Sequence, residues 1–205
     1  MPYPKLKTAG NAAIDDINES FKHHEIAETY SNLLDSNEMP LRVIHHDTKI
    51  SNVLFNDDQE ALCVVDLDTV MPGYYLSDVG AMMCTYLSAA NEEEKDLSKI
   101  GVRHEFFKAI YKEYLSEMDG VLTETEKRHF IFAGKMIIYI QALRFLTDFL
   151  NNDVYYGAKY PGHNLIRAKI QFKLLNEYIN AGLVFEQIIN DIQCQPADII
   201  GHKHN

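Results

Sequence analysis

Apolar residues recur at helical spacing along most of the chain. Between residues 12 and 34 they recur at roughly helical spacing, which predicts a helix that ends before Pro40. The same spacing predicts further helices over residues 77–90, 102–118, 124–150, 161–181 and 183–193. Ser77 would cap the first of these, and Thr123 with Glu126 forms a capping-box pattern at the start of another.

A different pattern occupies residues 42–70. The elements predicted there are, in order, a short apolar strand, a polar loop, a strand at 53–55, an acidic turn at 56–59 and a strand at 61–65. Such a hairpin would bring the loop carboxylate Asp47 toward the strand-end carboxylate Asp66. Pro72 and Gly73 then predict a turn. The expected fold class is mainly α (α+β), a helical bundle with one small antiparallel β-hairpin.

Composition narrows the kind of protein. The chain has 205 residues, of which 46% are hydrophobic and 24% charged, as in ordinary soluble domains. The net charge of −11, with no Lys/Arg run longer than two, argues against nucleic acid and anionic membranes as partners. Nucleotides stay possible, because metal ions can neutralise their phosphates. No h-region follows Met1, and no apolar run is expected to reach the about 20 residues of a membrane span.

The expected domain covers residues 11–193, after a lead-in at 1–10 and before a tail at 194–205. The three cysteines are far apart and odd in number, which favours buried thiols in a reducing compartment over a set of disulfides; they are Cys63, Cys84 and Cys194. A cytoplasmic location follows as the expectation.

The polar loop HHDTKISN has the spacing of a phosphotransfer loop. In protein kinases, the Asp of an HRD triplet accepts the proton of the substrate hydroxyl, and an Asn five residues later holds magnesium. Asp47 and Asn52 have this spacing, and Asp66 follows at the end of a strand. Phosphoryl transfer requires an oriented hydroxyl and hard oxygen ligands for Mg²⁺. Asp47 would supply the first, and Asn52 with Asp66 the second, while Lys49 would steady the transferred phosphate.

The run HHDTKISNVLF, followed by VVDLDTVMPG and LSDVG, resembles the catalytic lobe of the aminoglycoside phosphotransferase and choline kinase group of protein-kinase-like small-molecule kinases. The resemblance covers about residues 40–180. Within this group, DTKISNVLF and VDLDTVMPG are most similar to the N-acetylhexosamine 1-kinases. The resemblance implies a protein-kinase-like C-terminal lobe, with ATP as co-substrate, Mg²⁺ as cofactor and the hydroxyl of an amino sugar as acceptor.

The resemblance also implies residue roles. Asp47 would be the catalytic base, His45 would stabilise its loop, and Asp78 would brace that loop from the following helix. Asn52 and Asp66 would be metal ligands, with Asp68 at the edge of the metal or substrate site; these three complete the expected set around the hairpin.

The sugar 1-kinases contact the sugar through a later helix and loop, and the matching stretch here is QALRFLTDFLNNDVYYG. The resemblance therefore implies that Arg144, Tyr155 and Tyr156 bind the acceptor. Two structural alternatives stay open. Arg144 would otherwise pair with Asp148 one helical turn later, and the tyrosines would only pack their loop.

A kinase also needs a preceding β-rich lobe with a glycine-rich loop and a strand lysine. The first 40 residues contain neither, so the chain resembles the C-terminal lobe alone. We expect little or no kinase activity from it without an N-terminal lobe, and an exposed lobe face that would bind that lobe or a second copy. One alternative is a non-catalytic kinase-like binding module. Another is a haloacid dehalogenase-type phosphatase with Asp66 as nucleophile and Asp68 as acid/base, which requires a parallel sheet.

Overall fold

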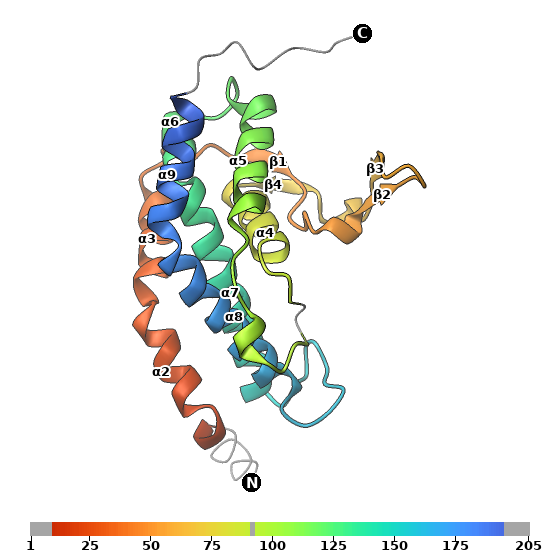
Figure 1. Cartoon of the computed structure of the whole chain (residues 1–205). Helices are drawn as coiled ribbons and strands as arrows, with labels where there is room; N and C mark the ends of the chain where they lie inside the picture. The colour runs from red at the N-terminus through yellow and green to blue at the C-terminus, as the bar shows by residue number, and fades with distance from the viewer. Residues whose placement is uncertain (1–9, 91–92, 195–205) are drawn as a thin grey trace.

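The computed structural model describes residues 10–90 and 93–194, and it is mostly helical (Figure 1). The predicted fold class is confirmed. The described helices are α2 (Ile14–Lys22), α3 (His24–Asp35), α4 (Leu76–Tyr86), α5 (His104–Met118), α6 (Glu124–Arg128), α7 (Phe130–Leu150), α8 (His163–Asn180) and α9 (Gly182–Gln193). The strands are β1 (Arg42–Ile44), β2 (Val53–Phe55), β3 (Ala61–Val64) and β4 (Met71–Gly73).

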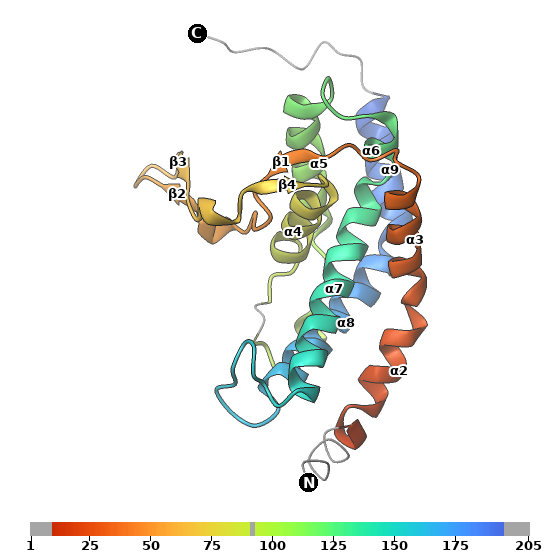
Figure 2. The same ribbon diagram turned by 180° about the vertical axis from the view of Figure 1, so that it is seen from behind.

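Helix α7 is the centre of the bundle. It lies beside α8 along its whole length and packs against α4 on another side, while α2 and α3 run along its outer flank (Figures 1 and 2). Two glycines allow these close approaches. A Cβ on Gly80 in α4 would overlap the carbonyl oxygen of Ala133, and a Cβ on Gly134 in α7 would overlap the ring of Tyr178 in α8. The core therefore depends on small residues where helices cross.

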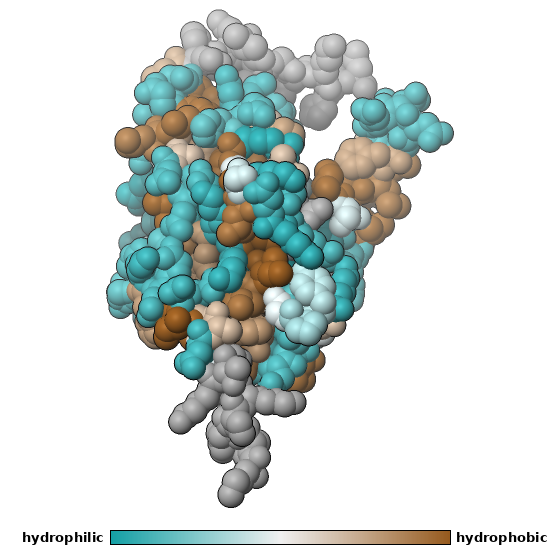
Figure 3. All heavy atoms as spheres, turned by 60° about the horizontal axis from the view of Figure 1, so that its bottom comes forward, coloured by the Kyte–Doolittle hydropathy of each residue, from teal (hydrophilic) through white to brown (hydrophobic). Residues whose placement is uncertain are grey.

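The strands form two separate antiparallel pairs, β1 with β4 and β2 with β3. The β2–β3 hairpin appears as predicted and stands away from the bundle in both ribbon views (Figures 1 and 2). Its stem is hydrophobic and its tip hydrophilic, as Figure 3 shows at the upper right. The exposed apolar side chains of the stem are Leu54, Phe55, Leu62 and Val64. Both sheets of the described residues are antiparallel, so the parallel sheet of a haloacid dehalogenase-type phosphatase is absent from them.

The turn predicted at Pro72 and Gly73 is wrong. These residues belong to β4, in which Pro72 lies opposite Val43 of β1. A two-stranded sheet has only edge strands, so a proline without an N–H group can occupy one. Because β4 pairs with β1, it lies beside the loop that follows β1.

Three helix predictions need correction. The helix predicted over 12–34 is broken at His23, where ψ is 16°, and the one over 124–150 is broken at His129, where ψ is 15°. Neither break has a Pro or Gly signal. The capping box of Thr123 and Glu126 is present as predicted. Ser77 is not a cap, because α4 begins one residue earlier and the Ser77 hydroxyl lies 3.3 Å from Nδ1 of His46.

Two expectations drawn from composition also change. Cys63, Cys84 and Cys194 are all free, but only Cys84 is buried. Helix α7 is long and apolar enough to cross a membrane by length and composition, contrary to the expectation for the chain. Its contacts with α4 and α8 account for this composition, since α7 is the core helix of the bundle. The predicted lead-in, apart from Gly10, and the predicted tail after Cys194 lie outside the described residues.

Candidate active site

The loop between β1 and β2 is fixed to the start of α4 by Asp78. Its Oδ2 accepts a hydrogen bond from the backbone N–H of His45 at 2.9 Å, and its Oδ1 accepts one from His46 at 2.7 Å. The hydroxyl of Thr48 donates to the Asp78 carbonyl at 2.7 Å, and Tyr86 donates to the Thr48 carbonyl at 2.7 Å. A carboxylate in the first turn also suits the helix dipole. Asp78 therefore makes the bracing contacts expected of it.

His45 links the same loop to the end of β3. Its Nε2 lies 3.0 Å from the carbonyl oxygen of Val65, and the backbone N–H of Asp47 donates to its Nδ1 at 3.3 Å. The neighbouring His46 has a left-handed backbone, with φ of 68°, and its ring fills the space where a Cβ on Gly73 would lie. The loop thus depends on a glycine in β4 whose role the sequence pattern did not reveal.

Asp47 lies at the centre of a compact polar group. Its Oδ2 forms an ion pair with Nζ of Lys49 at 2.6 Å and accepts a hydrogen bond from Nδ2 of Asn52 at 3.0 Å. The same Asn52 nitrogen lies 3.4 Å from Oδ2 of Asp66. The hairpin therefore brings the loop carboxylate and the strand-end carboxylate to one amide, as its pattern predicted.

Asn52 is buried and its amide has a defined direction. Nδ2 also donates to the backbone carbonyl of Asp47 at 2.8 Å, so the nitrogen side of the amide faces both Asp47 and Asp66. Mg²⁺ commonly takes one or two protein oxygens and completes its octahedron with water and phosphate. The Asn52 amide oxygen and the Asp66 carboxylate fit this requirement.

The other predicted metal ligand, Asp68, is exposed in the 3-10 turn Leu67–Thr69. No hydrogen bond or ion pair joins it to Asn52 or Asp66 in the part of the chain that the structure describes. Nor do three His, Cys, Asp or Glu side chains gather there into a metal-binding group. Asp66 itself has φ of 64°, and the Thr69 hydroxyl donates to its carbonyl at 3.1 Å. A cation at this place would therefore rely on Asn52 and Asp66.

A cleft of about 850 Å³ opens from the loop toward α7. Asp47 and Lys49 line it at the loop, and Arg144 and Tyr156 line it on the helical side, so residues about a hundred positions apart meet in one space. The sequence did not reveal three further lining side chains, Tyr30, Tyr74 and Gln141. Burial raises the pKa of Tyr30, and the neighbouring Tyr74 adds to the effect. The Tyr30 phenol therefore keeps its proton at neutral pH and can donate a hydrogen bond.

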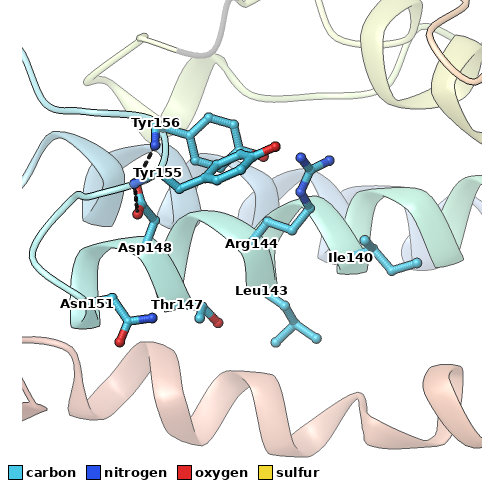
Figure 4. Close-up of a pocket in the computed structure, with 8 residues that line it drawn as sticks. All are labelled: Ile140, Leu143, Arg144, Thr147, Asp148, Asn151, Tyr155 and Tyr156. Carbon is cyan, nitrogen blue, oxygen red and sulfur yellow. Dashed lines mark hydrogen bonds between the residues drawn. The ribbon is translucent and has the colours of Figure 1, made fainter. Parts of the chain in front are cut away.

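A second, smaller hollow of about 420 Å³ adjoins the cleft (Figure 4). Arg144 and Tyr156 line both spaces, whereas Tyr155 lines only the smaller one. The guanidinium of Arg144 lies 5.4 Å from the ring centre of Tyr156 and 6.0 Å from that of Tyr155, within reach of a cation–π contact. Burial raises the pKa of Tyr156. The three predicted acceptor residues are thus neighbours, but only two of them face the Asp47 cleft.

The alternative pairing of Arg144 with Asp148 does not occur. Among the ion pairs of residues 10–90 and 93–194, none joins these two side chains, and the Asp148 carboxylate instead accepts the backbone N–H groups of Tyr155 and Tyr156 (Figure 4). Arg144 is therefore oriented by the aromatic rings, with an exposed side chain beside the cleft.

The fold and the site together are those of a kinase-like lobe: a helical body carries a small β element whose loop holds an Asp and an Asn at kinase spacing. The model of the phosphotransferase enzyme family (APH) matches residues 4–107, which is 104 of the 205 residues, and the chain belongs to this family. The matched segment includes the loop, the hairpin and Asp78. It ends before α7, so Arg144, Tyr155 and Tyr156 lie outside the match.

Proposed function

We propose that this chain is the catalytic lobe of an ATP- and Mg²⁺-dependent phosphotransferase that acts on a sugar hydroxyl, with an N-acetylhexosamine as the favoured acceptor. The observation that carries the proposal is the position of Asp47. Asp47 lines the large cleft, and the Asn52 amide nitrogen that donates to its carboxylate also lies 3.4 Å from Oδ2 of Asp66. The residues that we assign as base and metal ligands are therefore adjacent, as transfer from a metal-bound phosphate requires.

Asp47 is suited to accept a proton. The hydrogen bonds that its carboxylate accepts from Lys49 and Asn52 are both made to Oδ2, and no described residue donates to Oδ1. In the proposed reaction, the acceptor oxygen bonds to the γ-phosphorus and the bond from phosphorus to the leaving oxygen of ADP breaks. The hydroxyl proton passes to Oδ1 of Asp47. Such general-base assistance contributes about 10²–10⁴-fold to a rate.

The bound metal would neutralise the phosphate charge during transfer. Asn52 and Asp66 are assigned to hold it, with Asp68 at the edge of the site. Lys49 is assigned to the transferred phosphate, which would draw its ammonium group away from Asp47. His45 and Asp78 keep the loop in place through the hydrogen bonds described above.

The charge of the cleft favours a neutral sugar. Asp47 is its one carboxylate among the described lining residues, whereas Lys49 and Arg144 contribute positive charge. A polycationic aminoglycoside would meet a single acidic side chain, Asp47, among these residues. The phenols of Tyr30, Tyr74 and Tyr156 and the Gln141 amide offer hydrogen bonds and flat apolar surfaces; both suit a polyhydroxylated ring with an amide substituent.

The nucleotide is proposed to need a second structural unit. The described residues before β1 form helices α2 and α3, and no glycine-rich β lobe occurs within residues 10–90 and 93–194. The exposed apolar stem of the β2–β3 hairpin lies next to Asp66 and would be covered by such a lobe. We propose that the chain alone has little or no kinase activity, and that it works in the cytoplasm.

Transfer of labelled γ-phosphate from ATP to N-acetylglucosamine and N-acetylgalactosamine tests this function. The chain is assayed with Mg²⁺, alone and mixed with a glycine-rich β lobe of a family member, and Asp47→Asn is compared with Asp57→Asn at the hairpin tip. We expect transfer only in the mixture, and a loss of about 10²-fold or more in Asp47→Asn alone. Comparable transfer by the chain alone contradicts the need for the lobe. Binding of nucleotide and sugar without transfer in either sample favours a binding module.

A further inference from the structure

The loop at residues 151–162 joins α7 to α8 and forms the outer wall of the proposed acceptor site. It carries Tyr155 and Tyr156, whose rings lie over Arg144 (Figure 4). Asn152 and Asp153 have left-handed backbone angles, with φ of 65° and 58°, which non-glycine residues rarely adopt. Such a backbone needs fixed contacts to hold one conformation.

Asp148 in the last turn of α7 supplies these contacts. It is 5% exposed, and its Oδ1 accepts the backbone N–H of Tyr155 at 2.8 Å. Its Oδ2 accepts the N–H of Tyr156 at 2.9 Å and the side-chain amide of Asn164 at 3.0 Å. Hydrogen bonds to a carboxylate are about twice as strong as those between neutral groups. One buried carboxylate therefore holds the backbone N–H groups of two consecutive residues.

Asn164 completes the network from the start of α8. Its side chain is fully buried, and its amide nitrogen also donates to Oδ1 of Asp153 and to the carbonyl of Gly157, both at 2.9 Å. Arg167 donates to the Asn164 oxygen at 3.2 Å and lies over the ring of Phe145 at 3.7 Å. The loop is thereby held between two helices rather than packed only through its own tyrosines.

We infer that Asp148 is a positioning residue for acceptor recognition, acting through Tyr155 and Tyr156. It fixes the backbone that carries their rings, so that the rings face Arg144 before a ligand arrives. Ordering a loop at the moment of binding costs free energy, and a preorganised loop avoids that cost. The acceptor part of this inference rests on the proposed function, whereas the positioning of the loop rests on the contacts alone.

Two variants of Asp148 test its hydrogen bonds to the loop. Asp148→Ala removes every side-chain acceptor. Asp148→Asn keeps the shape but leaves one oxygen for two backbone donors, so its effect should be intermediate. Asp58→Asn at the hairpin tip serves as a matched control of charge. Thermal midpoints of all variants show whether the fold is retained.

Amide hydrogen exchange of Tyr155 and Tyr156, measured by NMR, is combined with titration of N-acetylglucosamine into the full chain. In Asp148→Ala, we expect exchange at these two amides to rise about tenfold or more and sugar affinity to fall by a similar factor. Binding of Mn²⁺ near Asp66, which a local role in the loop does not affect, should stay unchanged.

Unchanged exchange at both amides overturns the inference, as does increased exchange with unchanged sugar affinity. If Asp148→Ala does not fold, the same two criteria apply to Asp148→Asn. A wild-type chain that binds no sugar overturns the proposed acceptor class instead, and the exchange rates then decide the positioning by themselves.

Discussion

The side-chain nitrogen of Asn52 donates to both the backbone carbonyl and the carboxylate of Asp47, at 2.8 Å and 3.0 Å. These two bonds determine which way the amide faces. Its nitrogen faces Asp47 and also lies 3.4 Å from Oδ2 of Asp66, and its oxygen is the atom that would bind the proposed metal. One residue thereby couples the position of the proposed base to that of the proposed cation.

The brace on this loop predicts the effect of changing Asp78. Asp78→Ala leaves the N–H groups of His45 and His46 without their carboxylate, so we expect faster amide exchange at both. The free energy of unfolding should fall by about 1–3 kcal/mol. NMR exchange and urea unfolding check these effects, with Asp58→Asn as the control. Unchanged exchange at both amides would show that the loop does not depend on Asp78.

The parts of this site that could be predicted from sequence lie close to one another along the chain. The loop, the hairpin and Asp78 lie within residues 42–78, where local spacing and turn residues define the structure. The part played by Tyr30 was not predictable, because periodicity shows which face of a helix is apolar but not which neighbour it meets. The partition of the acceptor residues between two hollows likewise depends on tertiary packing.

The two helix breaks could not be predicted from the sequence either. His23 and His129 interrupt helices without a proline or glycine, so propensity gave no signal. The second break lies just after Glu126, whose carboxylate is fully buried against Arg42. Only the folded bundle reveals that contact.

The Arg42–Glu126 pair predicts a large stability effect. Nε and Nη2 of Arg42 donate to the two Glu126 oxygens at 2.7 Å and 2.6 Å. Burial alone would raise the pKa of Glu126, but the hydrogen bonds from Arg42 and Thr123 outweigh it and keep the pKa below its usual value. Arg42→Met leaves this buried carboxylate without its cation, which costs about 3–5 kcal/mol. Lys99→Met, which removes an exposed pair with Glu94, should cost about 1 kcal/mol or less in the same urea unfolding experiment.

Glu19 predicts a pH dependence of stability. The hydrogen bond from Asn176, followed by that from Lys22, lowers the pKa of Glu19 from 4.5 to about 2. Because the folded-state pKa is depressed, the stabilisation is complete above about pH 4.5 and is lost as the pH falls toward 2. Glu19→Gln should therefore have a lower thermal midpoint than the wild type at pH 6 and an equal one near pH 2. A difference that stays constant over this range, or that matches Glu28→Gln on the exposed face of α3, contradicts the assignment.

Two helical glycines are predicted to respond differently to an added methyl group. A Cβ on Gly134 would overlap the ring of Tyr178, so Gly134→Ala should destabilise the fold by about 1–3 kcal/mol. Gly182 begins α9, and a Cβ there meets no atom within 4 Å. Gly182→Ala should be neutral or stabilise by up to about 1 kcal/mol. Thermal unfolding of the two variants compares them, and equal midpoints would show that the helices can separate to accept the methyl group.

We propose that Asn52 and Asp66 hold a divalent cation beside Asp47. Paramagnetic broadening of NMR signals by Mn²⁺ tests it on the chain itself, without a nucleotide lobe. We predict that low Mn²⁺ concentrations broaden the signals of Asn52, Asp66 and their neighbours first, and that Asp66→Asn removes this effect while Asp58→Asn retains it. Broadening that begins elsewhere, or that persists equally in Asp66→Asn, would show that these two residues do not hold the cation.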